Sequence, residues 1–243
     1  MTENIYDDEA FFAAYSRLPR SLEGLPAAPE WPSLRALLPD LAGKRVLDLG
    51  CGFGWFCRWA REQGAASVLG LDVSERMLAR ARADTADRAI VYAKADLEHF
   101  AAPAEPVDLV YSSLVFHYVV NLAGLLGGIR ASLASGGALV FSVEHPIYTA
   151  PGNPGWSEAA DGRPVWPVDG YLDEGPRTTN WLVDGVIKQH RTIGRTVNLL
   201  VRSGFAVTRL EEWGPSAEQV AAHPDWANER QRPSFLLVAC ERR

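Results

Sequence analysis

The residues with the clearest chemical meaning form a glycine-rich loop after the first buried-type strand. Residues 46–54 read Val-Leu-Asp-Leu-Gly-Cys-Gly-Phe-Gly, and aromatic residues at helical spacing follow. Glycines at a strand-to-helix turn let the chain reverse sharply and let backbone amides approach a ligand closely. Asp72 ends the next strand about 20 positions further on, where a carboxylate can accept hydrogen bonds from both hydroxyls of a ribose. The loop and Asp72 together predict a site for a ligand that contains a nucleoside.

Asp48 separates two kinds of nucleoside ligand. A nicotinamide dinucleotide needs Gly-x-Gly-x-x-Gly, because its pyrophosphate rests on the helix N-terminus. Here the glycines are Gly50, Gly52 and Gly54, so the third comes one position early, and Asp48 precedes them. A carboxylate there would repel a pyrophosphate and attract an amine or a sulfonium. The sequence therefore favours a positively charged ligand without phosphate, and it disfavours an NAD-dependent oxidoreductase.

The segment Asp48-Leu49-Gly50-Cys51-Gly52-x-Gly54 resembles the first motif of class I S-adenosylmethionine (SAM)-dependent methyltransferases. It is similar to the bacterial small-molecule branch that includes the quinone-biosynthesis enzymes. The resemblance is close over residues 40–145 and extends to residues 193–240 in pattern only. It implies SAM as the cofactor and an α/β, Rossmann-like, doubly wound fold, in which a seven-stranded mixed sheet carries helices on both faces and a substrate-side insertion.

The same resemblance implies roles for individual residues. Backbone around Gly50, Cys51 and Gly52 would line the amino-acid part of SAM, and Asp72 would hold the ribose. The remaining implied contacts are Val73 and Met77 beside the adenine, Ala95, Asp96 and Leu97 at the end of the third strand with Asp96 on the adenine amino group, Ser112 near the methionine end, and His117 at the border of the methyl-donor pocket. For Asp72, Asp96, Met77 and His117, a purely structural role stays open.

Other residues are candidates for the acceptor side of the site. Methyl transfer mainly requires an aligned acceptor and the exclusion of water, and a base helps only where the acceptor loses a proton. Glu144 and His145 end the fifth expected strand, and His190 follows a hairpin signal at Asp184-Gly185, so these three are the catalytic candidates. Arg20, in the N-terminal segment, is a candidate for the SAM carboxylate.

The elements that must position these residues follow from the apolar pattern. Short buried-type runs alternate with helical segments, which is typical of a parallel sheet covered on both faces. We expect one domain over residues 1–243, with an N-terminal helical lid (1–40), a SAM-binding core (41–145), an insertion and hairpin on the substrate side (146–192), and a C-terminal helix and strand pair (193–243). Dense aromatic residues in the insertion would wall the acceptor pocket, or alternatively cover the sheet edge or a homodimer contact.

Composition limits the classes of partner. The chain has 243 residues, is 47% hydrophobic and carries a formal net charge of −6, without a basic cluster that would neutralise nucleic-acid phosphates. Its three cysteines and five histidines show no metal-ligand spacing, and no apolar run is long enough for a bilayer. We expect a cytoplasmic enzyme with a small-molecule acceptor, no metal, no nucleic acid and no membrane. A non-catalytic SAM-binding module and a protein or RNA methyltransferase remain the alternatives.

Overall fold

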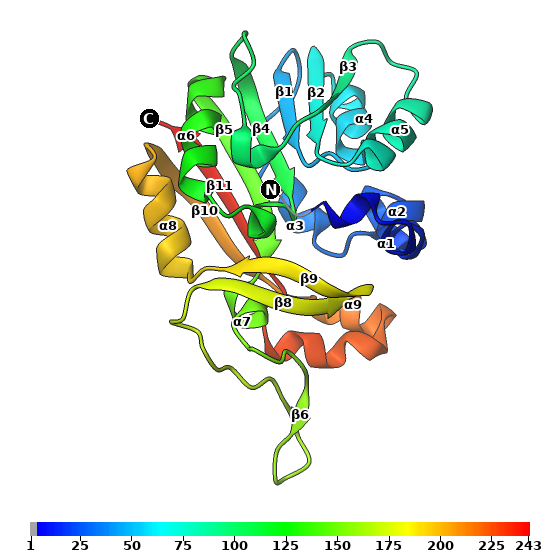
Figure 1. Cartoon of the computed structure of the whole chain (residues 1–243), viewed down its shortest axis with the longest axis vertical. Coiled ribbons are helices and arrows are strands. Elements are labelled where there is room, and N and C mark those ends of the chain that lie inside the picture. Colours follow the sequence, from blue (N-terminus) through cyan, green and yellow to red (C-terminus); the bar gives the residue numbers. More distant parts are fainter. Residues whose placement is uncertain (1–3) are drawn as a thin grey trace.

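The computed structural model describes residues 4–243, and its centre is a seven-stranded sheet in the order β10-β11-β5-β4-β1-β2-β3 (Figure 1). The strands are β1 (Arg45–Leu49), β2 (Ser67–Asp72), β3 (Ile90–Lys94), β4 (Val107–Ser113), β5 (Leu133–Glu144), β10 (Phe205–Trp213) and β11 (Phe235–Arg242). All neighbouring pairs from β3 to β5 are parallel, whereas β11 is antiparallel to both β5 and β10. The expected seven-stranded mixed sheet is confirmed, and its antiparallel strand, β11, lies next to the edge.

Helices cover both faces of the sheet, as the alternation of elements predicts. Helices α3 (Trp31–Arg35), α4 (Trp55–Glu62) and α5 (Glu75–Ala83) share one core cluster with the sheet, and α6 (Leu122–Ser132) and α8 (Ile193–Arg202) share the other. The apolar side chains of α6 are buried in the second cluster. Because the strands from β3 to β5 are parallel, their carboxyl ends lie along one edge of the sheet. Ligand sites of open α/β sheets form at this edge.

The loop after β1 needs glycine at two positions for steric reasons. Gly50 has φ +78°, and a Cβ there would lie 2.2 Å from Val115 Cγ2. Gly54 has φ +73°, and a Cβ there would lie 2.1 Å from Tyr92 Oη. Left-handed backbone and close packing both exclude side chains. The loop therefore brings its backbone amides to the carboxyl end of the sheet.

The segment after β5 is more structured than its irregular sequence suggests. It contains α7 (Pro146–Thr149), the short pair β6 (Ser157–Glu158) and β7 (Pro164–Val165), and the hairpin β8 (Gly175–Trp181) and β9 (Val183–His190). The prediction of a turn at Asp184-Gly185 is wrong: Trp181 pairs with Val183, and the chain turns at Leu182 with φ +63°. Asp184 and Gly185 lie within β9.

Segments from both ends of the chain gather at the carboxyl edge of the parallel strands (Figure 1). The N-terminal part contains η1 (Ile5–Asp7), α1 (Glu9–Tyr15), α2 (Pro19–Leu22) and η2 (Leu25–Ala27), and short 3-10 turns η3 (Leu97–His99) and η4 (Phe116–Tyr118) follow β3 and β4. Helix α9 (Ala217–Ala222) and η5 (Pro224–Gln231), between β10 and β11, were not predicted. Across residues 4–243, no helix has the length and apolar character needed to cross a membrane.

Candidate active site

A cavity of about 520 Å³ lies at the carboxyl ends of the parallel strands and extends beneath the N-terminal segment and the hairpin. Many of the residues predicted to bind cofactor or acceptor line it. They are Arg20, Gly50, Gly52, Asp72, Val73, Met77, Leu97, His117 and Glu144. The volume is in the range of cavities that hold small molecules and cofactors.

Asp72 stands where the glycine loop meets the end of β2. Its carboxylate is 9% exposed and accepts hydrogen bonds from the backbone N–H of Gly52 and of Ser74, each at 2.9 Å. Burial raises the pKa of Asp72, and the two backbone donors oppose that shift. Val73, Met77 and Leu97 lie beside it on the cavity wall. The Asp72 carboxylate, which can accept hydrogen bonds, thus faces a largely apolar part of the cavity. This is the arrangement expected for an adenosine.

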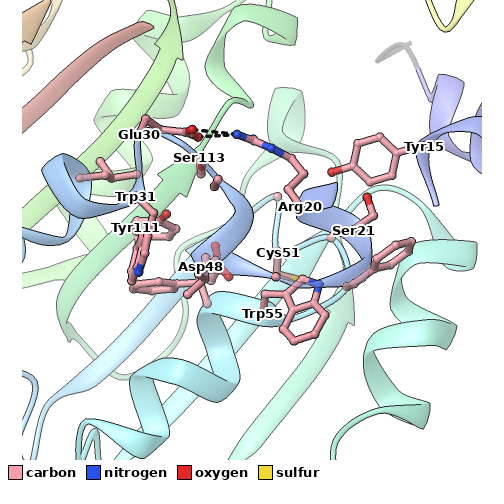
Figure 2. Close-up of a pocket in the computed structure, with 18 residues that line it drawn as sticks. Tyr15, Arg20, Ser21, Glu30, Trp31, Asp48, Cys51, Trp55, Tyr111 and Ser113 are labelled. Carbon is pink, nitrogen blue, oxygen red and sulfur yellow. Dashed lines mark hydrogen bonds and ion pairs between the residues drawn. The ribbon is translucent and has the colours of Figure 1, made fainter. Parts of the chain in front are cut away.

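A smaller pocket of about 110 Å³ adjoins the cavity behind the glycine loop (Figure 2). Asp48 and Cys51 line it, and Asp48 is 2% exposed with the thiol of Cys57 donating to its Oδ2 at 3.2 Å. Burial raises the pKa of Asp48 to about 7, which the hydrogen bond from Cys57 opposes. A carboxylate with a raised pKa in a small polar pocket is well suited to bind a cation, because a bound positive charge restores its ionised form.

Donor groups also line the small pocket. Arg20 lines both cavities, and its guanidinium holds Glu30 through Nη2 at 2.6 and 2.9 Å (Figure 2). The indole Nε1–H of Trp55 is buried and meets no acceptor within residues 4–243. A buried donor without a partner is costly unless a ligand supplies the acceptor. The pocket therefore offers both an acid and donors, which matches the two charged ends of an amino acid.

The far end of the cavity contains Glu144, at the carboxyl end of β5. Lys188 of β9 is 2% exposed, and its Nζ donates to Glu144 Oε1 at 2.6 Å. Glu144 Oε2 is buried and has no hydrogen-bond donor among the residues that the structure describes. His117 Nδ1 accepts from the Glu144 backbone N–H at 3.3 Å, and burial together with Lys188 and Arg191 lowers the pKa of His117 well below its usual range. His117 therefore stays neutral beside a fixed carboxylate.

A second wall of this end comes from the segment before β11, which sequence reasoning missed. Arg232 is 6% exposed and pairs with Glu229 at 3.0 Å. Its guanidinium lies over the rings of Trp166 at 4.0 Å and Tyr148 at 4.8 Å. Trp226 and Phe235 also line the cavity here. The only sequence signal was the density of aromatic residues in the insertion, which predicted a wall but not the arginine that organises it.

Five predicted site residues line neither cavity: Ala95, Asp96, Ser112, His145 and His190. The Asp96 carboxylate accepts from Glu98 N–H at 3.0 Å and caps η3, and Ser112 Oγ donates to the Leu49 carbonyl at 2.8 Å. The neighbouring Ser113 lines both cavities instead. The structure thus gives Asp96 and Ser112 structural contacts.

The two histidines among the catalytic candidates also depart from the prediction. His145 Nδ1 accepts from Ile147 N–H at 3.1 Å, where it caps α7, and its Nε2 meets Glu212 at 2.9 Å. His190 bonds Thr149 Oγ1 through Nδ1 and the Tyr171 carbonyl through Nε2, each at 2.9 Å. Both rings are fully buried with both nitrogens engaged. His145 joins α7 to β10 of the main sheet, whereas His190 joins parts of the insertion to one another. Of the three catalytic candidates, the structure brings Glu144 alone to the cavity.

The N-terminal segment is tied to both sides of the cavity. The Asp7 carboxylate accepts from Ser74 Oγ at 2.5 Å, next to Asp72. Phe11 and Tyr15 meet the ring of Trp181, at the end of β8, with centroids 5.5 and 6.2 Å apart. Tyr15 and Arg20 lie on the cavity wall. These contacts place the segment over the ligand-binding edge of the sheet.

Comparisons with known proteins identify the family of the chain. Residues 47–141 match a family described as a methyltransferase domain. The chain is similar to an S-adenosylmethionine-dependent methyltransferase of Mesorhizobium loti, known from a crystal structure, with 56% identity, a TM-score of 0.87, and coverage of 90% of this chain and 100% of that one. An uncharacterized protein of Haemophilus influenzae is 34% identical over 97% of this chain and 95% of its own. A malonyl-[acyl-carrier protein] O-methyltransferase of Pectobacterium atrosepticum is 38% identical, but over only 45% of this chain and 42% of its own. The protein belongs to the SAM-dependent methyltransferases, and SAM is its cofactor.

Proposed function

We propose that this enzyme transfers the methyl group of SAM to a small-molecule acceptor held at the Glu144 end of the cavity. One observation carries the proposal: a single cavity of about 520 Å³ joins the loop and Asp72 to Glu144 and Arg232. A non-catalytic SAM-binding module would have its acceptor space obstructed. A protein or RNA acceptor would need an open approach, whereas here the N-terminal segment and hairpin cover the site.

The residues of the two pockets fit SAM as follows. The adenosine would lie against Val73, Met77 and Leu97 with its ribose on Asp72. The amino-acid end would enter the small pocket, its ammonium toward Asp48 and its carboxylate toward Arg20 and Trp55. When bound, SAM supplies a methyl carbon activated by its positive sulfonium. The chain supplies alignment of the acceptor, exclusion of water by its aromatic walls, and a carboxylate at Glu144.

The free thiols favour a reducing compartment for this reaction. Cys51, Cys57 and Cys240 are all buried and unpaired as disulfides. Such cysteine usage is typical of the cytoplasm, and we place the enzyme there.

Calorimetric titration with S-adenosylhomocysteine (SAH) tests the cofactor site, with NADH as a parallel control. We expect saturable micromolar binding of SAH and no binding of NADH. Once an acceptor screen has found a substrate, the enzyme should convert SAM to SAH. Binding of NADH instead would overturn the assignment of the loop. Turnover on RNA or protein, with none on small molecules, would refute the acceptor class.

The affinity for SAH should increase as the pH rises from 5.5 to 7.5. The pKa of Asp48 is raised by folding to about 7, from about 3.9 in an unfolded chain. Between these pH values the carboxyl is ionised in the unfolded chain and stays protonated in the unliganded folded protein, so the stability of the unliganded protein falls as pH rises. A bound ammonium offsets that loss. Below pH 7 the ligand must displace the proton of Asp48. The Kd for SAH should therefore rise by up to about tenfold for each unit by which the pH falls.

An Asp48→Asn variant provides the matched control, because asparagine can still accept the hydrogen bond from Cys57. Its SAH affinity should be nearly independent of pH over this range and weaker at pH 7.5. Its thermal midpoint without ligand at that pH should be higher than that of the natural protein. An unchanged pH profile in this variant would show that Asp48 does not face the ammonium.

A further inference from the structure

Arg232 is a buried arginine on the wall of the large cavity, and its hydrogen bonds are incomplete. The residue is 6% exposed and lies beside Ser234 and Phe235 on that wall. Its Nη1 donates to Ser234 Oγ at 3.3 Å, and its Nη2 donates to Glu229 Oε2 at 3.0 Å. Its Nε is buried and meets no acceptor among residues 4–243. Because a guanidinium has five N–H donors and no acceptor, Arg232 keeps donor capacity for a ligand.

Aromatic side chains fix the position of this guanidinium. Its carbon Cζ lies 4.0 Å from the ring centroid of Trp166, 4.8 Å from that of Tyr148 and 5.2 Å from that of Trp156. A guanidinium that packs on aromatic rings presents its N–H groups at its edge, in the fork that matches the two oxygens of a carboxylate. The rings also exclude water, so a donor without an acceptor costs more here than at the surface. Arg232 is thus held ready for a planar anion.

The carboxylate that pairs with Arg232 does not use all of its donors. The Glu229 side chain is 33% exposed, so water hydrates part of it, and it also accepts from Ser234 Oγ at 3.1 Å. A carboxylate on the ligand would complete the hydrogen bonds of Arg232 while Glu229 stays in place. Glu229 and Glu144 line the same cavity, and Glu144 is balanced by Lys188 at 2.6 Å. With two carboxylates on the wall, a ligand with one negative charge is repelled less than a phosphate monoester with two.

The strand order places Arg232 away from the cofactor. The residue precedes β11, and the glycine loop follows β1, three strands away in the sheet. At about 4.8 Å between neighbouring strands, this separation is roughly 14 Å. Hydrogen bonds to a carboxylate also lower its basicity, which makes it a poor nucleophile. A carboxylate on Arg232 would therefore anchor the acceptor, and a different atom of the acceptor would receive the methyl group.

We propose that Arg232 binds a carboxylate of the acceptor, so that the substrate is a small organic acid whose methylated atom lies nearer to the end of β4. This inference rests on the proposed function. It makes Arg232 a residue that selects the acceptor and has no part in holding SAM. A purely structural arginine, which only joins Trp156 and Trp166 of the insertion to the segment before β11, would give no preference for an anion.

Benzoate and benzamide test the inference, because they share a ring and a size and differ in charge. Each is titrated into the SAH-loaded protein, and binding is measured by saturation-transfer NMR. Benzoate should bind on the order of tenfold more tightly, because charge-assisted hydrogen bonds are about twice as strong as neutral ones. Equal binding of the two probes, or no binding of benzoate, would overturn the inference. Phenyl phosphate, which is a dianion at pH 8, should bind more weakly than benzoate, and tighter binding would refute a carboxylate as the ligand.

Variants of the ion pair distinguish an anion site from a structural arginine. Glu229→Gln removes the competing charge at constant size, so benzoate should bind more tightly, by roughly threefold to tenfold. Arg232→Gln should abolish the preference for benzoate, and Arg232→Lys should keep only part of it, because lysine retains the charge without the fork. Arg230 bonds the Pro215 carbonyl and does not line the cavity, so Arg230→Gln should keep the full preference. Unchanged preference in Arg232→Gln, or weaker benzoate binding in Glu229→Gln, would refute the inference.

SAH calorimetry with and without saturating benzoate separates the inference from the proposed function. Benzoate should not raise the Kd for SAH, because the two ligands occupy different ends of the cavity. A raised Kd would place benzoate in the cofactor site and overturn the inference. Loss of SAH binding in the natural protein would contradict the cofactor assignment, whereas normal SAH binding without a benzoate preference would remove the inference alone. The comparison of probes on the natural protein needs no variant, so it stands even where Arg232→Gln folds poorly.

Discussion

Replacing Asp72 with alanine is expected to raise the Kd for SAH on the order of tenfold to a hundredfold. Hydrogen bonds to a charged group contribute about 1.5–3 kcal/mol, and each 1.4 kcal/mol is about tenfold in affinity. The carboxylate also accepts from Gly52 and Ser74 N–H, so its loss would free the loop that shapes the site. Both effects weaken binding, and neither should alter the core cluster around α4.

Calorimetry of Asp72→Ala, Asp72→Asn and Asp96→Ala at one pH would check this. Asparagine retains an oxygen for the backbone donors, so Asp72→Asn should lie between alanine and the natural protein. Asp96 caps η3 and does not line the cavity, so Asp96→Ala should bind SAH almost normally. Unchanged affinity in Asp72→Ala would mean that the ribose lies elsewhere. A large loss in Asp96→Ala would restore its predicted contact with the adenine.

The sheet and its cofactor edge could be predicted because local signals determine them. Buried strands appear as short apolar runs, and the loop after β1 requires glycine wherever φ is positive and a neighbour is close, as at Gly50. Asp72 was found for the same reason: it ends a strand that the pattern identifies. Such features need only the residues themselves and a known chain direction.

The acceptor end could not be predicted because long-range packing determines it. The tip of the hairpin is at Leu182 rather than at Asp184-Gly185, and Trp181 beside it packs on Phe11 and Tyr15, far away in sequence. At this hairpin the tertiary contacts outweigh the local turn preference of Asp184-Gly185. His190 is a catalytic candidate from its position in the sequence, yet both of its ring nitrogens form hydrogen bonds within the fold.

Arg232 is a residue of the acceptor wall that the sequence does not predict. No motif surrounds it, and only the path of the chain through α9 and η5 brings it to the aromatic residues of the insertion. Apart from Glu144 at the end of β5, the side chains of the acceptor wall come from segments with no periodic pattern, whereas the glycine loop and Asp72 of the cofactor site follow or end strands. Variation in the former would change the substrate without disturbing SAM binding.

Replacing Lys188 with alanine is expected to destabilise the protein by about 3–5 kcal/mol at pH 8, because removing one partner of a buried ion pair leaves the other uncompensated. Lys188 is 3% and Glu144 16% exposed at the side chain. The remaining carboxylate would escape the cost by taking up a proton, so its pKa in the folded state would rise. The loss of stability should therefore be smaller at pH 5 than at pH 8, since a raised carboxyl pKa lowers stability as pH rises toward it.

Urea unfolding at both pH values measures this effect, and the double variant Lys188→Met with Glu144→Gln should recover much of the loss because neither charge remains. Arg82→Ala, which breaks an exposed pair with Glu75, should leave the unfolding midpoint nearly unchanged. A small, pH-independent effect of Lys188→Ala would mean that Glu144 reaches water in the unliganded protein. Glu144 would then not be held in place for an acceptor, so this stability measurement also tests whether the carboxylate is fixed before the substrate arrives.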